Sequence, residues 1–338
     1  MNILVTGGAG FIGSNLVHTL ASSGETVRVL DDFSTGRPGN LTGLNGRVEV
    51  LEGDVRDQLA VRVAVTGVHV VYHLAALPSV ARSVADPRAS HSVNAEGTLN
   101  VLLAARDAGV RRLVYASSSS VYGDTPTLPK HEEMAVSPRS PYAAAKLAGE
   151  AYCRALAHVS SLDTVCLRFF NVFGPRQDPT SQYAAVVPRF ITRMLAGEPA
   201  EVTGDGRQTR DFTYVANVVE ACRLAAAAGP EASGEAMNIG CNDRISVLGL
   251  AEIVNDLLGE RIDPVFVPAR VGDVRDSQAA IDKAARLIGY RPLVTVRDGL
   301  AATVDWLAAE RAGPGRPRDL PDVPPRQPAE PDQGVAAR

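Results

Sequence analysis

The sequence lacks the features that define several large classes of protein. No run of 18 or more apolar residues occurs in it, so we expect no membrane-spanning helix and no membrane partner. The 34 lysines and arginines do not outnumber the 38 aspartates and glutamates, and the net charge of −4 argues against a nucleic-acid partner. A strand-like run begins within the first six residues and leaves no room for a signal peptide, so we expect a cytoplasmic location.

Cysteine is also scarce, and its spacing argues against a metal site. The four cysteines lie far apart without a Cys-x-x-Cys pair, and the six histidines form no His-Glu-x-x-His motif. A structural zinc site needs ligands in close pairs. We therefore expect four free thiols and no bound metal.

What the chain does contain is a regular alternation of short apolar runs and longer helical stretches. The apolar runs are rich in valine, isoleucine and leucine, as expected of strands covered on both faces. They span residues 2–6, 26–31, 48–52, 68–73, 112–117 and 164–168. The helical stretches span residues 11–23, 58–66, 89–108 and 141–158. This order predicts an α/β fold with a doubly wound, parallel, Rossmann-type sheet, which binds ligands at the carboxyl ends of its strands.

After residue 168 the rhythm changes, and a smaller C-terminal lobe is expected. Residues 174–214 carry four prolines and a Gly-Asp-Gly turn, which predicts short elements. A helix over 215–228, a strand over 236–240 and a helix over 246–258 are expected to return to the main sheet. The predicted units are a Rossmann domain of 1–175 plus about 215–258, a substrate-binding lobe of 176–214 and 259–311, and a proline-rich disordered tail of 312–338.

A glycine-rich segment joins the first predicted strand to the first predicted helix. Gly7, Gly10 and Gly13 allow the backbone to approach a pyrophosphate closely, and the helix amino end offers it free N–H groups. The second strand ends at Asp31 and Asp32, where a carboxylate can accept hydrogen bonds from an adenosine ribose and repel a 2′-phosphate. The pattern favours NAD over NADP, although Asp31 could instead only begin a turn.

A tyrosine and a lysine lie four residues apart in the helical stretch 141–158. Tyr142 and Lys146 share one helix face, and the ammonium is expected to lower the pKa of the phenol toward neutrality, which would make it a usable acid or base. The stretch follows a serine run at 117–120, where a strand ends and a sugar hydroxyl would need a partner. Taken alone, the pair could be an exposed helix face and the serine run a solvated loop.

Motifs along residues 1–310 together give the sequence a family resemblance. They are TGGAGFIG (6–13), HLAA (73–76), SVNAEGT (92–98), SSSSVYG (117–123), YAAAK (142–146), RFFNVFGPRQ (168–177), GDGRQTRDFTYV (204–215), NIG (238–240) and RVGDVRDSQAAIDKA (270–284). In this combination the chain resembles an extended short-chain dehydrogenase/reductase, and most closely the UDP-sugar 4-epimerases.

The resemblance implies a set of site residues. The catalytic ones are Ser118, Tyr142 and Lys146. The cofactor contacts are Gly7, Gly10, Phe11, Ile12, Gly13, Asp31, Asp32, Asp54, Val55, Leu74, Ala75, Ala76, Asn94, Ser117, Tyr142, Lys146 and Phe169. The substrate contacts are Ser79, Ser118, Ser119, Ser120, Tyr142, Asn171, Val187, Val202, Arg210, Arg270, Asp273 and Ser277. In this last set Asn171, Arg210 and Arg270 match diphosphate ligands, Asp273 matches a ligand of the uridine ribose, and Val187 and Val202 match the border of the uracil.

The function that the resemblance implies is an isomerase that uses NAD to interconvert UDP-glucose and UDP-galactose. Tyr142 would take the proton of the sugar 4-hydroxyl, with Ser118 bridging, while the C4 hydride passes to NAD. The 4-keto sugar would then rotate and take the hydride back on its other face. Ser277 stands where some 4-epimerases carry a bulky tyrosine, so UDP-N-acetylglucosamine and UDP-N-acetylgalactosamine are also expected as substrates.

Several alternatives stay open at this point. A UDP-glucuronate 4-epimerase could hold its carboxylate with the three hydroxyls of residues 118–120, although Asn171 in place of a threonine argues against it. Ser119 and Ser120 replace the acid residues of nucleotide-sugar dehydratases and decarboxylases, which disfavours both. The complete catalytic set disfavours a non-catalytic NAD-sensing protein. The stretches 89–108 and 141–158 are expected to pair across a homodimer, as in relatives.

Overall fold

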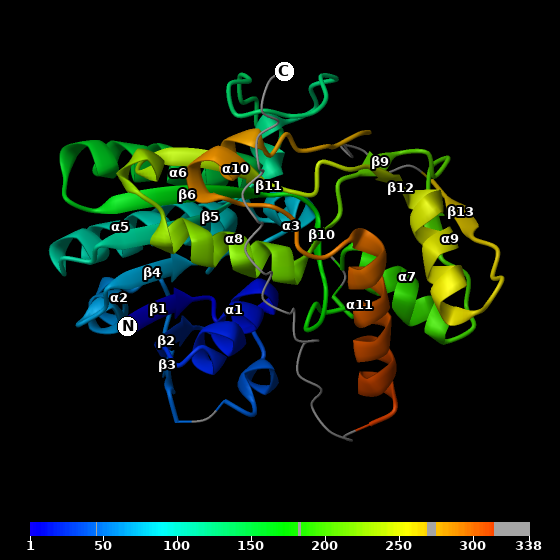
Figure 1. The fold of residues 1–338 in the computed structure, drawn as a ribbon, viewed down its shortest axis with the longest axis horizontal. Coiled ribbons are helices and arrows are strands. Elements are labelled where there is room, and N and C mark those ends of the chain that lie inside the picture. Colours follow the sequence, from blue (N-terminus) through cyan, green and yellow to red (C-terminus); the bar gives the residue numbers. More distant parts are fainter. Residues whose placement is uncertain (45, 182–183, 269–274, 314–338) are drawn as a thin grey trace, which may run out of the picture.

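The computed structural model describes residues 1–44, 46–181, 184–268 and 275–313. At its centre, seven strands form a sheet in the order β11-β6-β5-β4-β1-β2-β3, and every neighbouring pair is parallel (Figure 1). These strands are β1 (Asn2–Thr6), β2 (Thr26–Asp31), β3 (Val48–Glu52), β4 (Val70–His73), β5 (Arg112–Ser118), β6 (Asp163–Phe169) and β11 (Glu235–Ile239). The predicted doubly wound α/β fold is confirmed, and its switch point, where ligands bind in such sheets, lies between β1 and β4.

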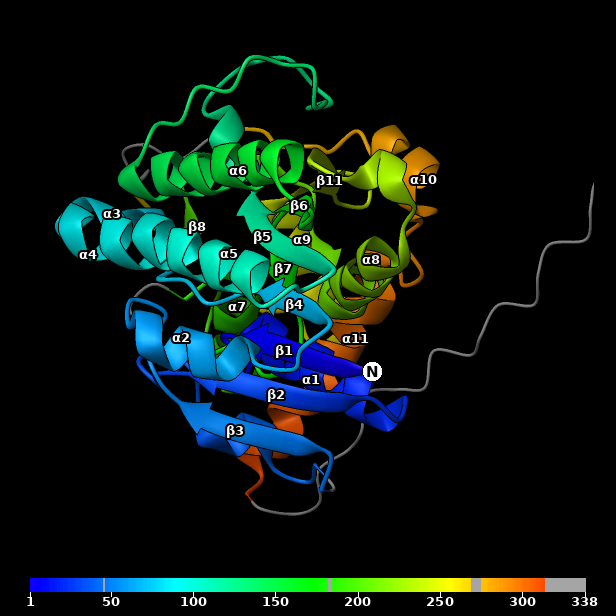
Figure 2. The same cartoon turned by 90° about the vertical axis from the view of Figure 1, so that its left-hand side faces the viewer.

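Helices cover both faces of this sheet (Figure 2). One layer contains α2 (Gln58–Val65), α5 (Gly97–Asp107) and α6 (Pro141–Val159), and the other contains α1 (Phe11–Ser22) and α8 (Val215–Ala227). Successive residues of β1 enter opposite layers, because side chains alternate along a strand. Ile3 and Val5 are buried with residues of α1 and α8, whereas Leu4 is buried with residues of α2 and α5.

The helix predicted over residues 89–108 differs in detail. It consists of α4 (Pro87–His91), a π-helical stretch at Ser92–Glu96 and α5, and a further helix, α3 (Val80–Ala85), precedes it. Gly97, at the start of α5, lies so close to β3's continuation that a Cβ there would be 2.6 Å from Val55 Cγ2. The wider π turn therefore occurs next to a tight contact, and such turns are frequent at functional sites.

The second half of the chain forms smaller units beside the main sheet (Figure 1). Three strand pairs are β7 (Val172–Phe173) with β10 (Thr213–Tyr214), β8 (Glu201–Thr203) with β13 (Val265–Val267), and β9 (Thr209–Arg210) with β12 (Ile245–Ser246). The helices are α7 (Val186–Leu195), α9 (Val247–Leu258), α10 (Asp282–Ile288) and α11 (Val296–Arg311).

Two expectations for this half are wrong. The ten-residue helix α7 lies where only short elements were expected, because Pro188 falls in its first turn, where a missing N–H is tolerated. Helix α9 packs against α7 and α11, whereas α8 and β11 do join the main sheet as predicted.

The division into domains stays a prediction, and the expected disordered tail lies almost entirely outside the described residues. No helix among the described residues is long and apolar enough to cross a membrane.

Candidate functional site

A pocket lies at the carboxyl ends of the central strands, where the strand order reverses. Of the predicted cofactor residues, all except Asp54 and Asn94 line it. Sequence reasoning missed Leu30, Ser34, Thr35, Gly53, Leu77, Pro78, Val93 and Ala116. Several of these follow directly from strand ends that the sequence marked, because Ser34 and Thr35 come after Asp31-Asp32, and Gly53 precedes Asp54.

The glycine segment forms one wall of the pocket through its backbone. Gly7 has a φ of +70°, and a Cβ there would lie 2.6 Å from the Ala75 nitrogen. A Cβ on Gly13 would lie 2.1 Å from the Gly7 carbonyl oxygen. Among the described residues no side chain caps the amino end of α1, so its first N–H groups stay available to an anionic ligand.

Asp31 lines the pocket at the end of β2 and also shapes the turn that follows. Its Oδ2 accepts a hydrogen bond from the Ala9 N–H (2.8 Å), and its Oδ1 accepts one from the Phe33 N–H (2.9 Å). Burial raises the pKa of this carboxyl. Each oxygen keeps a further lone pair. Asp31 can therefore stabilise the turn and also accept a hydrogen bond from a ribose hydroxyl.

Asp54 and Asn94 lie near the pocket but direct their side chains elsewhere. The Asp54 carboxylate accepts hydrogen bonds from Arg56 Nη2 (2.5 Å) and Nε (2.9 Å), and this contact lowers its pKa. Asn94 holds both main-chain groups of Leu77, accepting from its N–H (2.8 Å) and donating to its carbonyl (3.0 Å). Since Leu77 lines the pocket, Asn94 shapes the wall indirectly.

A buried histidine, which the sequence marked only as part of the HLAA motif, ties this wall to the sheet. His73 Nδ1 lies 2.7 Å from Thr6 Oγ1, and its Nε2 lies 2.9 Å from Thr98 Oγ1. Thr98 donates its own proton to the Asn94 carbonyl, so the hydrogen-bond network assigns the ring proton to Nε2. Burial lowers the pKa of His73 to about 3, so the ring is neutral at physiological pH.

The three predicted catalytic residues meet at the end of β5. Tyr142 and Lys146 both line the pocket, and Lys146 Nζ lies 5.9 Å from the centroid of the Tyr142 ring. Lys146 also donates a hydrogen bond to the Ala116 carbonyl (2.8 Å). Ser118 hydrogen-bonds Tyr142, and its Oγ lies 2.9 Å from Ser120 Oγ.

The prediction that Lys146 lowers the pKa of Tyr142 is wrong. Burial raises the pKa of Tyr142 to about 12, and only the hydrogen bond with Ser118 opposes the change. Burial instead lowers the pKa of Lys146 to about 8. Sequence spacing placed the two groups correctly, but it carries no information on how much water each has lost.

Three predicted substrate residues come together from distant segments of the chain. Asn171 Nδ2 donates hydrogen bonds to Ser277 Oγ (3.1 Å) and to the Asp211 carbonyl (3.0 Å). The Ser277 N–H donates to the Thr209 carbonyl (3.1 Å), and Arg210 follows directly in β9. The structure therefore joins Asn171, Arg210 and Ser277 in one cluster.

The remaining predicted substrate residues are less clearly placed. The Ser79 hydroxyl caps α3 and accepts a hydrogen bond from the Arg82 N–H (3.3 Å). Ser119 and Ser120 begin a 3₁₀ turn at Ser119–Tyr122. The side chains of Val187 and Val202 are buried in the hydrophobic core, so only their backbone could border a base. Arg270 and Asp273 lie outside the described residues.

Sequence reasoning missed the carboxylate that organises this cluster. Asp211 is fully buried and accepts hydrogen bonds from the N–H groups of Cys241 (2.8 Å) and Ala279 (3.0 Å). Burial raises its pKa to about 6, although the main-chain hydrogen bonds oppose the change. Its place next to Arg210 in the motif was the available signal. No group of three histidine, cysteine, aspartate or glutamate side chains that could hold a metal occurs in the part of the chain that the structure describes.

Comparisons with known proteins agree with this geometry. A model of the NAD dependent epimerase/dehydratase family matches residues 3–240. The chain is 41% identical over 310 residues to a UDP-glucose 4-epimerase of Mycolicibacterium smegmatis, a match that covers 90% of this chain and 98% of the relative.

Two solved structures extend the comparison. A UDP-N-acetylglucosamine 4-epimerase of Methanobrevibacter ruminantium, in complex with UDP-N-acetylmuramic acid, is 36% identical with a TM-score of 0.87, covering 91% of this chain and 98% of its own. A variant UDP-glucuronic acid 4-epimerase of Bacillus cereus, in complex with UDP-4-deoxy-4-fluoro-glucuronic acid and NAD, is 33% identical with a TM-score of 0.85, covering 92% of this chain and 100% of its own.

Proposed function

The chain belongs to the NAD dependent epimerase/dehydratase family, and on this premise we propose that it is a UDP-hexose 4-epimerase whose principal substrates are UDP-glucose and UDP-galactose. The observation that carries the proposal is the meeting of Tyr142, Lys146 and Ser118 beside a dinucleotide pocket. A phenol, an ammonium and a hydroxyl in this arrangement can move the proton of a sugar alcohol.

The structure of the pocket fits NAD, the cofactor of this family. The backbone wall at Gly7 and Gly13 has no room for a Cβ, the amino end of α1 has no side-chain cap, and Asp31 with Asp32 presents carboxylates at the end of β2. These are the features that hold a pyrophosphate and a ribose without a 2′-phosphate. When bound, NAD supplies the nicotinamide ring that accepts a hydride from C4 of the hexose and gives it back.

In the proposed reaction, the protein's own groups move one proton out and back. Tyr142 accepts the proton of the 4-hydroxyl, and Ser118, which hydrogen-bonds Tyr142, orients that hydroxyl. Lys146 lies beside the phenol, with its Nζ 5.9 Å from the ring centroid, and would hold the hydroxyls of the nicotinamide ribose when NAD is bound. After the 4-keto sugar has rotated, Tyr142 returns the proton to the oxygen at C4, so one residue serves both directions.

The substrate-side cluster would hold the diphosphate while the hexose turns. Arg210, whose Nη1 donates to the Thr209 and Arg275 carbonyls, follows Thr209, and the Thr209 carbonyl accepts from the Ser277 N–H. Ser277 in turn accepts from Asn171, and the Arg210 guanidinium is the group of this cluster that would bind phosphate. A serine at position 277 is small, which supports acceptance of UDP-N-acetylglucosamine and UDP-N-acetylgalactosamine as well. The serine run at 118–120 supports UDP-glucuronate as the second candidate substrate, because three hydroxyls can hydrogen-bond a carboxylate.

The enzyme is further proposed to be a homodimer that pairs through α5 and α6. These helices lie side by side on the outer layer of the sheet (Figure 2), and Ala151 on α6 is exposed while Leu103 on α5 is half-buried. Charges introduced by Leu103→Glu with Ala151→Glu are expected to give monomers in light scattering. Leu293→Glu, an exposed position outside these helices, is the control. A wild-type protein that is monomeric at micromolar concentration would refute the dimer.

One experiment tests the function directly. The purified protein is incubated with UDP-galactose, UDP-N-acetylglucosamine and UDP-glucuronate in separate reactions, and the C4 epimer of each is quantified by NMR. Conversion of UDP-galactose to UDP-glucose at the highest kcat/KM is expected. Retained NAD without turnover of any UDP-sugar would favour a cofactor-sensing protein, and preference for UDP-glucuronate would favour the second candidate.

A further inference from the structure

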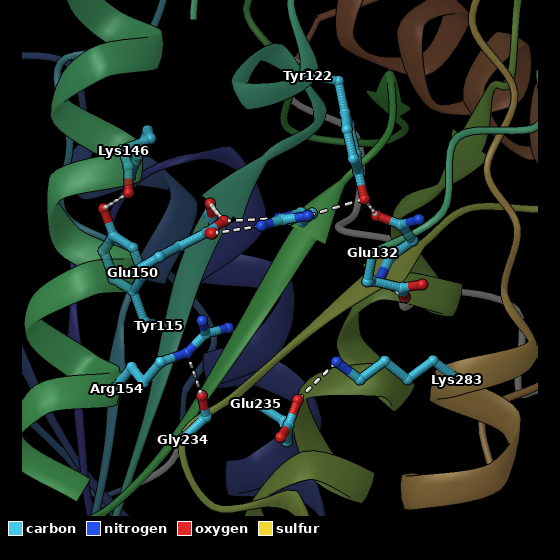
Figure 3. A network of polar contacts seen from close by, with 12 residues as sticks. Tyr115, Tyr122, Glu132, Lys146, Glu150, Arg154, Gly234, Glu235 and Lys283 are labelled. Atoms are coloured by element: carbon cyan, nitrogen blue, oxygen red, sulfur yellow. Dashed lines mark hydrogen bonds and ion pairs between the residues drawn. The ribbon is translucent and has the colours of Figure 1, made fainter. Parts of the chain in front are cut away.

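Three residues at intervals of one turn form a polar stripe on α6. Tyr142, Lys146 and Glu150 face the end of β5, and Figure 3 shows Lys146 and Glu150 on successive turns of the helix. Three consecutive residues of β5 meet this stripe. The Ala116 carbonyl accepts from Lys146 (2.8 Å), and Ser118 hydrogen-bonds Tyr142. Ser117, between them, donates its hydroxyl proton to Glu150 Oε1 (2.5 Å).

Glu150 is buried and paired with one arginine of the neighbouring strand β6. Arg168 Nη2 donates to Glu150 Oε2 (2.7 Å) and Arg168 Nε donates to Oε1 (2.9 Å), and the side chains of Arg168 and Glu150 are only 5% and 7% exposed. A two-pronged contact of this kind fixes the carboxylate in position and orientation. Figure 3 shows Glu150 within this network.

The arginine is fixed in turn at its far side. Arg168 Nη1 donates to the Tyr122 hydroxyl (2.9 Å), and that hydroxyl donates to Asn238 Oδ1 (2.7 Å) on β11. The guanidinium carbon also lies 4.9 Å from the centroid of the Tyr122 ring. The ion pair is therefore held by β5, β6, β11 and α6 together, and Glu150 cannot swing away without breaking several buried contacts.

Two groups raise the pKa of Lys146 against burial, Cys153 and then Glu150, and of the two only Glu150 carries a carboxylate. The groups around Lys146 are, on α6, Tyr142, Glu150 and Cys153, on β5 Tyr115, on β4 His73 and on β6 Arg168. Burial keeps His73 and Tyr115 uncharged by lowering the pKa of the first and raising that of the second. Among the described groups that act on Lys146, Glu150 is thus the only carboxylate.

We propose that Glu150, clamped by Arg168 and Ser117, is a positioning residue that keeps Lys146 charged and seated beside Tyr142. The inference rests on the proposed function for the use made of Lys146, but the electrostatic effect itself requires no turnover. Lys146 is only 2% exposed, so burial opposes its charge, and a fixed carboxylate one turn away offsets part of that penalty.

The two members of the ion pair should act on Lys146 with opposite sign. Glu150→Gln removes the carboxylate and leaves the Arg168 cation without a partner, so the pKa of Lys146 should fall. Arg168→Met removes the cation and leaves the carboxylate, so the pKa of Lys146 should rise. The double variant should lie between them. A merely structural role would loosen the site in the same direction in every variant.

The chain offers a direct way to measure this, because it contains only three lysines, Lys130, Lys146 and Lys283. The enzyme with its cofactor is labelled with lysine carrying ¹³C at Cε, and the three signals are followed by NMR from pH 6 to pH 11. Lys146→Met assigns the Lys146 signal. Glu150→Gln is expected to lower the Lys146 midpoint by about one unit or more, a tenfold change in the ratio of its two forms.

A matched control lies in the same view. Glu235 pairs with Lys283 through Oε2 and Nζ (2.6 Å), and both are partly exposed (Figure 3). Glu235→Gln should leave the Lys146 midpoint unchanged. The alkaline limb of the kcat profile should move with the NMR midpoint in Glu150→Gln.

A Lys146 midpoint that stays fixed in both Glu150→Gln and Arg168→Met, or that shifts the same way in both, would overturn the proposal. If Glu150→Gln fails to fold, the proposal is tested by the rise of the Lys146 midpoint expected in Arg168→Met. Shifted midpoints in an enzyme that turns over no UDP-sugar would refute only the proposed function.

Discussion

The pocket and the cluster around Asn171 and Ser277, which we propose as the cofactor side and the substrate side of the site, are built in different ways. One wall of the pocket is backbone from one short segment, in which a φ of +70° at Gly7 and the close approach of Gly13 to Gly7 shape the surface. The substrate side is mostly side chains from segments far apart, with Asn171 and Ser277 joined across 106 positions. The first side can be recognised in the sequence, because its glycines lack a Cβ. The second depends on contacts between distant residues, which exist only after folding.

The difference has a physical consequence for how each side can be damaged. A backbone wall fails sterically when a single methyl group is added, because its neighbours are main-chain atoms that cannot move aside. A side-chain cluster is instead disrupted by the loss of a charge or of hydrogen bonds, so the effect of a substitution there depends on pH and on the neighbouring side chains. A change on one side should therefore spare the other, whereas a change at Tyr142, where the two sides meet, should remove the chemistry and leave both sides able to bind.

Tyr142→Phe should have the largest effect. Loss of the phenolic oxygen removes the group that moves the proton, and general acid–base groups contribute about 10²–10⁴-fold to rate. Retained NAD and unchanged UDP-sugar binding are expected, since the pocket walls are intact. Tyr152→Phe on the exposed face of the same helix is the control and should be fully active. Full activity of Tyr142→Phe would disprove its role as the base.

Asp211→Asn should break the substrate side in a pH-dependent way. The pKa of Asp211 is raised to about 6 from its usual 3.8, so the folded state binds more protons than the unfolded state between these values. Its contribution to the free energy of unfolding is therefore largest below pH 4 and falls by about 3 kcal/mol as pH rises through 6.

Urea unfolding of wild type and variant at pH 4 and pH 7 measures this contribution. The stability of the wild type relative to Asp211→Asn should decrease over that range, while the NAD content at neutral pH stays the same. An identical difference at both pH values would show that Asp211 has no raised pKa in the folded chain.

Gly13→Ala should break the cofactor side alone. The added Cβ would lie 2.1 Å from the Gly7 carbonyl oxygen, and relieving such overpacking costs about 2 kcal/mol, or some thirtyfold in NAD affinity. NAD released by heating and measured by absorbance gives the occupancy. Gly39→Ala, where no atom lies within 4 Å of the new Cβ, is the control. Equal NAD occupancy in the two variants would contradict the backbone account.

Ser277→Tyr should have the smallest and most selective effect. The ring would fill space next to Asn171 and exclude an N-acetyl group, lowering kcat/KM for UDP-N-acetylglucosamine about tenfold relative to UDP-glucose. Side-by-side assays with the two substrates measure the ratio. An unchanged ratio would mean that other side chains set the size of the hexose site.

The comparison also explains which features could be predicted from the sequence. Apolar runs predicted six strands of the main sheet, the expected strand over 236–240 is the seventh, and the glycines predicted the backbone wall of the pocket, because these signals are local. The π turn before Gly97, the helix α7 and the packing of α9 depend on contacts with distant segments. The same is true of His73, Asp211 and the Glu150–Arg168 pair, which sequence spacing gave no reason to connect.

The pKa of Tyr142 shows the limit most clearly. Spacing four residues apart correctly placed Tyr142 and Lys146 on one helix face, both lining the pocket. Desolvation then raised the tyrosine pKa and lowered the lysine pKa, against the expectation from charge proximity. Burial is a property of the whole fold, so the electrostatics of a site cannot be obtained from the spacing of its residues.

The most direct test of the central claim follows a single hydrogen atom. UDP-glucose carrying deuterium at C4 is converted by the enzyme in ordinary water, and the UDP-galactose formed is analysed by NMR and mass spectrometry. If the hydride leaves C4 beside Tyr142 and returns within the same closed site, the product keeps its deuterium at C4. Replacement of that deuterium by solvent hydrogen would contradict the account.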